Sequence, residues 1–578
     1  MKKKILISLV FLFSILHIYC QNIYTIDSLK IQQLEGLCRI WGYLKYYHHE
    51  IQKGKIDWDT TLILYIPKIL IDNNNEEYNE KINQLILLPG RVKKLDRPYK
   101  YLPQDTSYNN FDFSWINNEN LFTKDNSRLL WEIIENYKPR KNIYLKRELN
   151  KYYDENGKDK YYYESDYYPD TAHALLAFFR YWNAINYFFA YKKITDENWN
   201  NILNQFIPKI LESANSSKFY STIAELITKI NDCHGYYDNY NFNHEVGMLK
   251  SYIDWRSIPF IVKFIENKTV ISDIDSFVAV KTNLKQGDII LSINRIPIDE
   301  IRNDLRKYCG CSHQLSVDRE IDNGIFMSHF VPEGKDITIT VSDSTNITKA
   351  VSFNLNNLSE KEQWMTGSAI NNFTYSSEDS IGYINLSGIG TMKNFRKKYK
   401  NLKNSKALIF DIRNVDNVWL WYSVLLRLPK LHKKNVQLTN YYFRNWKYPG
   451  TYLLTKQKYM FLLGLPAFHK KYRGKVVLLI DENLQSAEEW TLMGMKALYK
   501  INLVGNNTSG TDGEAVSFLI QNNFLTYFTA DAVFYPNGRP TQRVGIKPDI
   551  YAVPTIKGIR EHRDEVSERA LEFIRTGK

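Results

Sequence analysis

The sequence has few of the residues that would hold a metal or staple a small fold. Only five of its 578 residues are cysteine, and Cys309 and Cys311 are too close together for an ordinary unstrained disulfide between them. No second cysteine pair has the spacing of zinc ligands, so the cysteines do not predict a metal site. Beyond the N-terminus, no apolar run is long enough to cross a bilayer, which excludes a further transmembrane segment.

The charge is positive but not concentrated. Lysine and arginine total 76 against 63 acidic residues, for a formal net charge of +13. These residues are scattered, and no zinc-finger spacing or ribonucleoprotein-type aromatic motif accompanies them, so we do not expect nucleic-acid binding. With 44% hydrophobic and 24% charged residues, the chain is globular and long enough for several domains. Nothing in the sequence indicates an oligomeric state.

The N-terminal segment, 1–20, has the layout of a secretory signal peptide. Three lysines precede an apolar run from Ile5 to Ile18, and polar chain follows. Cleavage after Cys20 would leave Gln21 first, in an exported protein that is periplasmic or extracellular. The alternative is an outer-membrane form anchored by a lipid on Cys20. Ile18-Tyr19 match poorly the small residues that a lipidation signal needs, so we favour the soluble form.

Two tryptophan-containing segments repeat with the same spacing. Trp41 and Trp58 are 17 positions apart, and so are Trp182 and Trp199. The apolar spacing within each copy is helical, so the sequence predicts a duplicated helical unit. We expect one unit over 21–136, a charged, tyrosine-rich exposed linker over 137–170, and a second unit over 171–250.

From about Ser251 the pattern changes to short β-like runs with glycine and polar breaks. The stretch VAVKTNLKQGDIILSINRIPIDEI resembles a PDZ domain, which captures extended chain ends by adding a strand to its sheet. This resemblance implies a PDZ-like domain over 251–357, with Gly287 and Asp288 in its peptide-binding part. The remaining residues, 358–578, would form a separate core.

Ser486 lies between a predicted strand and a predicted helix. An apolar run over 475–480 precedes DENLQSAEEW, and Trp490 and Met493 follow at helical spacing. A further strand-like run over 501–504 completes a strand, serine, helix, strand unit. This order places the Ser486 hydroxyl at a helix N-terminus.

Two interpretations of Ser486 follow from the residues alone. Ser486-Ala-Glu-Glu489 is a capping box, in which the serine accepts from the N3 amide and the glutamate reaches back. In the other interpretation the serine is a nucleophile, since free amides and the dipole at a helix start stabilise an oxyanion. The capping box is the more common meaning of this pattern on its own.

The surrounding blocks favour the nucleophile. GKVVLLIDENLQSAEEW, LVGNNTSGTDGEAVSF, YPNGRPTQRVGIKPDI and GIREHRDEVSERALEFI, in this order, resemble the tail-specific (C-terminal-processing) serine peptidases, nearer their tricorn-like branch and of the secreted bacterial type. SIGYINLSGIG and NSKALIFDIRN resemble the same core. The resemblance implies an α+β multidomain fold with helical N-terminal repeats, a PDZ-like β domain and an α/β, crotonase-like (ClpP-like) peptidase core.

The resemblance also implies catalytic roles. Ser486 takes the position of the nucleophile, while Thr511 stands where one branch has its lysine base. The other branch uses a histidine just before the PDZ region, after a small hydroxyl residue. Here Cys233-His234 occupies that place, and His234 would act as general base and then acid. Ser486 would serve as both N-cap and nucleophile, and the reaction would need no metal or organic cofactor.

Three features depart from the family pattern. Cys233 replaces the hydroxyl residue, and Gln542 stands where the orienting glutamate is expected, so Glu514 or Asp512 could supply the acid. The oxyanion hole would combine the amide of Ala487 with one from the loop after 411–414, for which Val415 is the candidate. That loop is glycine-poor in this chain.

Two functions are therefore weighed. The favoured one is a serine endopeptidase that cleaves exported polypeptides through an acyl-enzyme and binds them, in part, by their C-termini. The alternative is a weakly active or inactive peptide-binding or ligand-binding protein that retains the peptidase fold. A scaffold that works through the helical repeats is a third possibility.

Overall fold

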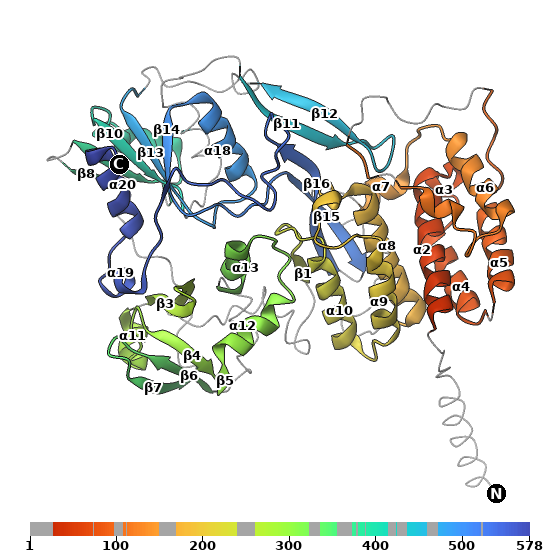
Figure 1. Ribbon diagram of the computed structural model, residues 1–578, viewed down its shortest axis with the longest axis horizontal. Helices are drawn as coiled ribbons and strands as arrows, with labels where there is room; N and C mark the ends of the chain where they lie inside the picture. Colours follow the sequence, from red (N-terminus) through yellow and green to blue (C-terminus); the bar gives the residue numbers. More distant parts are fainter. Residues whose placement is uncertain are drawn as a thin grey trace, which may run out of the picture.

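The computed structural model describes residues 27–72, 74–96, 108–110, 112–148, 169–239, 260–274, 276–322, 336–354, 373–376, 380–387, 389–413, 424, 436–458, 472–521 and 524–578. These residues form a helical region (27–228), a small sheet domain (260–354) and an α/β core (373–578) (Figure 1). The predicted signal peptide lies outside the described residues. Within them, no helix is long and apolar enough to span a membrane.

The helical region contains the predicted duplication. The two copies place matching helices at equivalent positions, as in α4 (Trp58–Leu70) and α9 (Asn201–Leu211). In the first copy each indole N–H of Trp41 and Trp58 donates to the other residue's carbonyl oxygen at 2.9 Å. Trp182 and Trp199 make the same reciprocal pair at 3.1 Å. The repeated tryptophans therefore connect equivalent pairs of helices in the two copies, as expected for a repeat.

Further elements complete the helical region. They are α2 (Ser28–Tyr47), α3 (His49–Gln52), α5 (Asn75–Leu87), η1 (Ser114–Asn117), α6 (Lys124–Glu135), α7 (Ile143–Glu148), α8 (Thr171–Phe188), η2 (Lys192–Ile194) and α10 (Ser216–Thr228). Asn74 and Asn215 cap α5 and α10 in the same way, since each side chain accepts an amide hydrogen bond from the first turn.

Part of the predicted exposed linker is buried. Tyr137 is 3% exposed and donates its hydroxyl to the Lys447 carbonyl at 2.8 Å, while Tyr144 and Leu145 belong to the main hydrophobic cluster. The prediction of a solvated connection is therefore wrong for Tyr137, Tyr144 and Leu145, because their apolar surface is covered by the helices and by the core. Residues 149–168 of the linker lie outside the described residues.

The small sheet domain is an antiparallel sheet with helices. Its strands are β2 (Phe260–Ile265), β3 (Lys268–Ile274), β4 (Ile289–Ile293), β6 (Asp336–Ser342) and β7 (Thr348–Asn354) in that spatial order, with β5 (Ile296–Pro297) beside β4. Its helices are α11 (Ser276–Thr282), α12 (Ile298–Arg306) and α13 (Gln314–Glu320). The predicted β-rich domain is thus present, and its PDZ-like identity stays a prediction.

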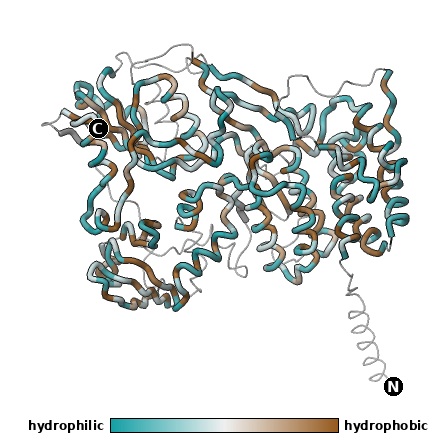
Figure 2. The backbone as a smooth tube through the Cα atoms, viewed as in Figure 1, coloured by the Kyte–Doolittle hydropathy of each residue, from teal (hydrophilic) through white to brown (hydrophobic). Residues whose placement is uncertain are grey.

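The α/β core is built on a six-stranded sheet in the order β17-β14-β13-β10-β9-β8. The strands are β8 (Phe373–Ser376), β9 (Ile381–Asn385), β10 (Ala407–Asp411), β13 (Lys475–Ile480), β14 (Ile501–Gly505) and β17 (Ile550–Tyr551), parallel except for β8. The central strands are almost continuously hydrophobic and buried, as expected for a parallel sheet covered on both faces (Figure 2).

Helices cover both faces of this sheet. One hydrophobic cluster joins it to α16 (Met392–Tyr399) and α18 (Ala487–Leu498), and another joins it to α20 (Glu565–Thr576). The short helix α19 (Ile556–Arg560) packs instead against the small sheet domain, where Ile556 and Ile559 share a separate cluster with Ile265 and Ile289. The predicted strand, serine, helix, strand unit is β13-α18-β14.

A second sheet joins the core to the helical region. Its strands are β1 (Tyr237–Asn239), β11 (Gln437–Arg444), β12 (Tyr452–Lys458), β15 (Glu514–Gln521) and β16 (Phe524–Phe534). Phe518 of β15 and Phe528 of β16 are buried in the same cluster as the helices, so the two parts share one hydrophobic core. The helical repeats are therefore fixed against the core, and the residues that follow α10 reach it directly.

Candidate active site

Ser486 lies at the turn between β13 and α18, with an unusual backbone. Its φ of 59° and ψ of −118° are values that non-glycine residues seldom adopt. The Ser486 amide donates to the Thr511 carbonyl oxygen at 2.6 Å, which holds this conformation. Strained serines at strand-to-helix turns present their hydroxyl to a reaction partner in several hydrolases.

Ser486 occupies the N-cap position but does not cap the helix. Its side chain makes no capping hydrogen bond, and its hydroxyl instead donates to the Gly513 carbonyl oxygen at 3.4 Å. Glu489 does not reach back either. It is fully buried and accepts from the amides of Gly510 and Thr511 at 2.9 and 2.7 Å and from the Thr508 hydroxyl. The capping-box interpretation is therefore wrong, because tertiary donors have taken up the glutamate.

Glu489 thereby fixes the loop that holds Ser486. Its carboxylate accepts hydrogen bonds from the amides of Gly510 and Thr511, and the Thr511 carbonyl oxygen in turn accepts one from the Ser486 amide. Burial raises the pKa of Glu489 to about 7, opposed by these three hydrogen bonds. A glutamate at this position thus acts on the serine through the 508–511 loop and not through the helix end.

His234 comes from the loop that follows α10 in the second helical repeat. It is 6% exposed, and its Nδ1 lies 2.8 Å from the hydroxyl oxygen of Thr529 on β16. Burial lowers the pKa of His234, Asp232 opposes that shift, and Arg319 adds to it. The imidazole is therefore held neutral in a fixed orientation at neutral pH.

Asp232 is the acid beside this histidine. It is fully buried and accepts four hydrogen bonds: from the Thr529 hydroxyl (2.6 Å) and amide (2.9 Å), the His234 amide (3.1 Å) and the Gln542 side-chain amide (3.2 Å). Sequence reasoning missed Asp232. The signal was available, since an aspartate two residues before a candidate base can fold back onto its amide in a tight turn.

Gln542 contacts Asp232 and not the imidazole. Its Nε2 donates to Asp232 Oδ1, and its Oε1 accepts the Asp512 amide at 3.0 Å. Asp512 is itself buried and accepts from the Thr541 hydroxyl at 2.9 Å and the Gly513 amide at 2.7 Å. Neither Asp512 nor Glu514 has a hydrogen bond to His234 among the described residues, so the predicted substitute acids do not take that place.

Cys233 forms a disulfide with Cys311 at the start of the α13 segment. The prediction that Cys233 takes part in catalysis is therefore wrong, because its sulfur is bonded and carries no thiol hydrogen. The pairing was not predicted from the sequence, since the partner is 78 residues away. The disulfide attaches the His234 loop to the small sheet domain.

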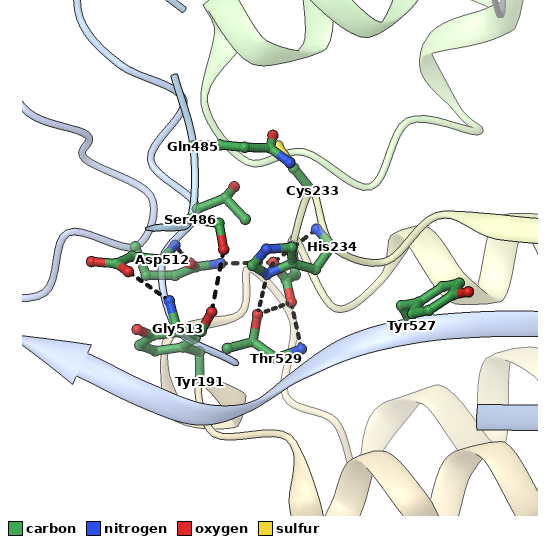
Figure 3. Close-up of polar contacts among 12 residues, drawn as sticks. Tyr191, Cys233, His234, Gln485, Ser486, Asp512, Gly513, Tyr527 and Thr529 are labelled. Atoms are coloured by element: carbon green, nitrogen blue, oxygen red, sulfur yellow. Dashed lines mark hydrogen bonds and ion pairs between the residues drawn. The ribbon is translucent and has the colours of Figure 1, made fainter. Parts of the chain in front are cut away.

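The two predicted catalytic side chains lie in one network. In Figure 3 the Ser486 hydroxyl points into the same space as the His234 imidazole. Hydrogen bonds run from His234 through Thr529 and Asp232 to Gln542 and Asp512, and Gly513 beside Asp512 accepts the Ser486 hydroxyl. Among the described residues, Ser486 and His234 share no direct hydrogen bond. Such bonds are often long in enzymes without substrate and shorten when it binds.

The predicted oxyanion donors can be placed only in part. Ala487 is exposed at the first position of α18, and its amide has no hydrogen-bond partner among the described residues. It is therefore available to an anionic oxygen next to Ser486. Val415 lies outside the described residues.

Gly287 and Asp288 are not free to bind a peptide. The Gly287 amide donates to the Ile271 carbonyl, and the Asp288 carboxylate accepts the Lys285 amide. The Arg560 side chain of α19 covers Gly287 and donates to its carbonyl oxygen at 3.1 Å. The prediction of a peptide-binding role for these two residues is wrong, because they form the junction with the core.

Helix α13 connects the small sheet domain to the Ser486 loop (Figure 1). Ser316 donates to the Ser509 carbonyl oxygen at 2.7 Å. Arg319, nearly buried, donates to the Glu482 carbonyl and to the Gln485 side chain, both at 2.8 Å. Together with the disulfide, these contacts hold both halves of the site from one segment.

A buried acid–hydroxyl–histidine arrangement beside a strained serine at a strand-to-helix turn defines a serine-hydrolase type of site. Residues 380–552 match the model of peptidase family S41, which identifies this part of the chain as a serine-peptidase domain. No curated protein sequence matches the chain.

Solved structures similar to this one cover most of the chain. The structure of mature CPAF complexed with lactacystin is 14% identical, covers 70% of this chain and 97% of its own, and has a TM-score of 0.51. The crystal structure of mature CPAF is 13% identical, covers 70% of this chain and 96% of its own, and has a TM-score of 0.51. The photosystem II D1 C-terminal processing protease also matches, at 12% identity, 67% and 94% coverage and a TM-score of 0.38. The CPAF likeness shows that the shared fold extends beyond the matched family domain.

Proposed function

We propose that the chain hydrolyses peptide bonds in polypeptides through an acyl-enzyme on Ser486, with His234 as the base. The observation that carries this proposal is the position of Ser486. Its backbone is held at a strained turn, its hydroxyl lies in the same space as a buried neutral imidazole (Figure 3), and a helix amide without a partner among the described residues stands next to it. These are the parts that acyl transfer requires.

In the first step the Ser486 oxygen attacks the scissile carbonyl carbon while its proton passes to Nε2 of His234. The amide of Ala487 donates to the oxyanion that forms. The imidazolium then protonates the leaving amine, and the peptide bond breaks. Water, deprotonated by the same imidazole, attacks the ester and releases the second product. The neutral state of His234, which burial favours, is the one this cycle needs at its start.

Substrate capture and location are further parts of the proposal. The small sheet domain would hold an extended chain, in part by its C-terminus, at a place other than Gly287 and Asp288. Export to an oxidising compartment agrees with the signal-like segment 1–20 and with the Cys233–Cys311 disulfide.

A non-catalytic peptide-binding protein is the second candidate. The observation in its favour is that the Ser486 hydroxyl donates to the Gly513 carbonyl and makes no bond to His234 among the described residues. In that case the site would bind polypeptide without cleaving it.

A hydrolysis assay with an unfolded polypeptide distinguishes the peptidase from the non-catalytic binding protein. The mature chain and its Ser486→Ala variant are incubated with reduced, carboxymethylated casein, and new amino groups are counted. We expect release of amino groups by the native chain and loss of at least 1000-fold of this rate in the variant. Binding of casein without cleavage by the native chain would favour the second candidate.

A further inference from the structure

Asp232 binds the backbone amide of His234 but makes no hydrogen bond to its imidazole ring. The shortest approach of Asp232 to the His234 ring is 3.7 Å, from Oδ1 to Nδ1, which is too long for a hydrogen bond. The Thr529 hydroxyl lies between them, 2.8 Å from Nδ1 and 2.6 Å from Asp232 Oδ2. Any influence of the carboxylate on the imidazole through hydrogen bonds must therefore pass through the threonine.

The donors at these atoms fix where the protons lie. The Thr529 hydroxyl has one hydrogen, and an ionised Asp232 has none, so the hydroxyl must donate to the carboxylate at 2.6 Å. The Thr529 oxygen is then an acceptor toward the ring. His234 Nδ1 must carry the proton and donate it, which leaves Nε2 unprotonated.

We propose that Thr529 and Asp232 form a hydroxyl relay that orients His234 in the tautomer needed to accept the Ser486 proton. This inference rests on the proposed function, since it assigns positioning roles for the same reaction. During attack, the Ser486 proton moves to Nε2, while Nδ1–H stays on the Thr529 oxygen and the Thr529 hydrogen stays on Asp232. No proton leaves the relay, and the Nε2 proton goes next to the leaving amine.

The surroundings of Asp232 suit this role. Two backbone amides, one hydroxyl and the Gln542 side chain satisfy both of its oxygens. The carboxylate is completely buried, so its negative charge acts on the developing imidazolium through a medium of low polarity. Thr529 is also fully buried and lies on β16, a strand fixed by the shared hydrophobic core.

The relay also explains two departures from the family pattern. Gln542 stands next to a carboxylate that is already present, so a neutral side chain that donates a hydrogen bond fits there and a second carboxylate does not. A hydroxyl residue is not needed at position 233, because Thr529 on β16 supplies the hydroxyl that contacts the imidazole. The bonded sulfur can then serve as an anchor for the loop.

Thr529→Val tests the relay with nearly unchanged shape. We expect kcat for casein hydrolysis to fall about 100- to 1000-fold with KM within about 3-fold, and Thr529→Ser to stay within about 5-fold of the native chain. Asp232→Asn should lower kcat at least as much as Thr529→Val does.

Thr526→Val is the matched control. Thr526 is another fully buried threonine of β16, and its hydroxyl donates to the Tyr236 carbonyl at 2.9 Å. This variant loses a hydroxyl-to-carbonyl hydrogen bond on the same strand and leaves Thr529 and Asp232 unchanged. Equal losses of kcat in Thr526→Val and Thr529→Val, or in the serine and valine variants of Thr529, would overturn the proposal.

The tautomer of His234 gives a readout that does not depend on catalysis. In ¹⁵N spectra of the histidine-labelled mature chain at pH 8, the signal lost in His234→Gln is assigned to His234. We expect Nδ1 to be protonated in the native chain and the tautomers to mix in Thr529→Val. An Nε2-protonated ring in the native chain would overturn the relay. If the native chain cleaves nothing but has the Nδ1-protonated ring, the proposed function fails while the relay stands.

Discussion

Replacing Gln542 by glutamate separates the structural account from one based on the family resemblance. Because glutamate is expected at this position in the family, Gln542→Glu would restore a lost catalytic group if the glutamine were a defect. In the structure, the Gln542 Nε2 donates to Asp232 Oδ1 at 3.2 Å. The substitution exchanges that donor for a carboxylate oxygen that faces another buried carboxylate.

The size of the effect follows from that distance. Two negative charges about 3.2 Å apart repel by about 5 kcal/mol at an effective dielectric constant of 20. The pair avoids this by keeping a proton on one carboxyl, so the pKa of the introduced glutamate rises in the folded chain. Retaining that proton at pH 7, against an ordinary glutamate pKa of about 4.3, costs the folded state up to about 4 kcal/mol.

The stability of the Gln542→Glu variant should fall as the pH rises. A carboxyl whose pKa is raised by folding binds more protons in the folded state, so stability falls as pH rises above about 4.3. The variant should therefore unfold at nearly the native temperature at pH 5 and at a progressively lower temperature by pH 7. A proton shared with Asp232 also weakens the relay, and we expect kcat at pH 7 to fall at least 10-fold.

Thermal unfolding at pH 5, 6 and 7, together with casein hydrolysis, measures both effects. Gln542→Met is the control, since it removes the hydrogen bonds without adding a carboxyl and should show no such slope with pH. Activity of Gln542→Glu equal to or above that of the native chain, with unchanged stability at pH 7, would refute the reasoning.

Three further predictions concern the rest of the site. Converting both Cys233 and Cys311 to alanine opens a loop of 78 residues, and we expect a loss of about 4 to 5 kcal/mol of folding free energy from chain entropy, measured by thermal unfolding. An unchanged unfolding temperature would contradict this. Arg319→Met removes two hydrogen bonds from a charged group to the Ser486 loop, so kcat should fall about 10-fold, with Arg319→Lys between it and the native chain. A change confined to KM would argue against positioning. Because burial lowers the pKa of His234, the acid limb of kcat/KM should lie below pH 6.5, and a limb above that pH would exclude His234 as the base.

The sequence predicts those parts of the fold and site that depend on neighbouring residues. The tryptophan spacing predicts the duplicated helices because each indole pairs with a carbonyl 17 residues away, inside one copy. The β13-α18 turn at Ser486 is predicted by an apolar run followed by helical spacing. The position of His234 after the second repeat, together with the family resemblance, identifies it as the candidate base.

Contacts between distant residues are the part that the sequence does not predict. Asp232 and Thr529 are 297 residues apart, and no local pattern relates an aspartate in a turn to one threonine of a long strand. The Cys233–Cys311 bond is hidden for the same reason. Glu489 satisfies a capping-box pattern locally, yet the Gly510 and Thr511 amides bind it more favourably in the folded chain.

The central claim is that Ser486 is a nucleophile activated by His234, and covalent labelling tests it most directly. The mature chain, Ser486→Ala and His234→Ala are treated with a fluorophosphonate probe at matched folding, and the modified residue is identified by mass spectrometry. The account predicts an adduct on Ser486 in the native chain, none in Ser486→Ala, and labelling at least 100-fold slower in His234→Ala. Absence of an adduct in the native chain between pH 6 and 9, or labelling that His234→Ala leaves unchanged, would contradict it.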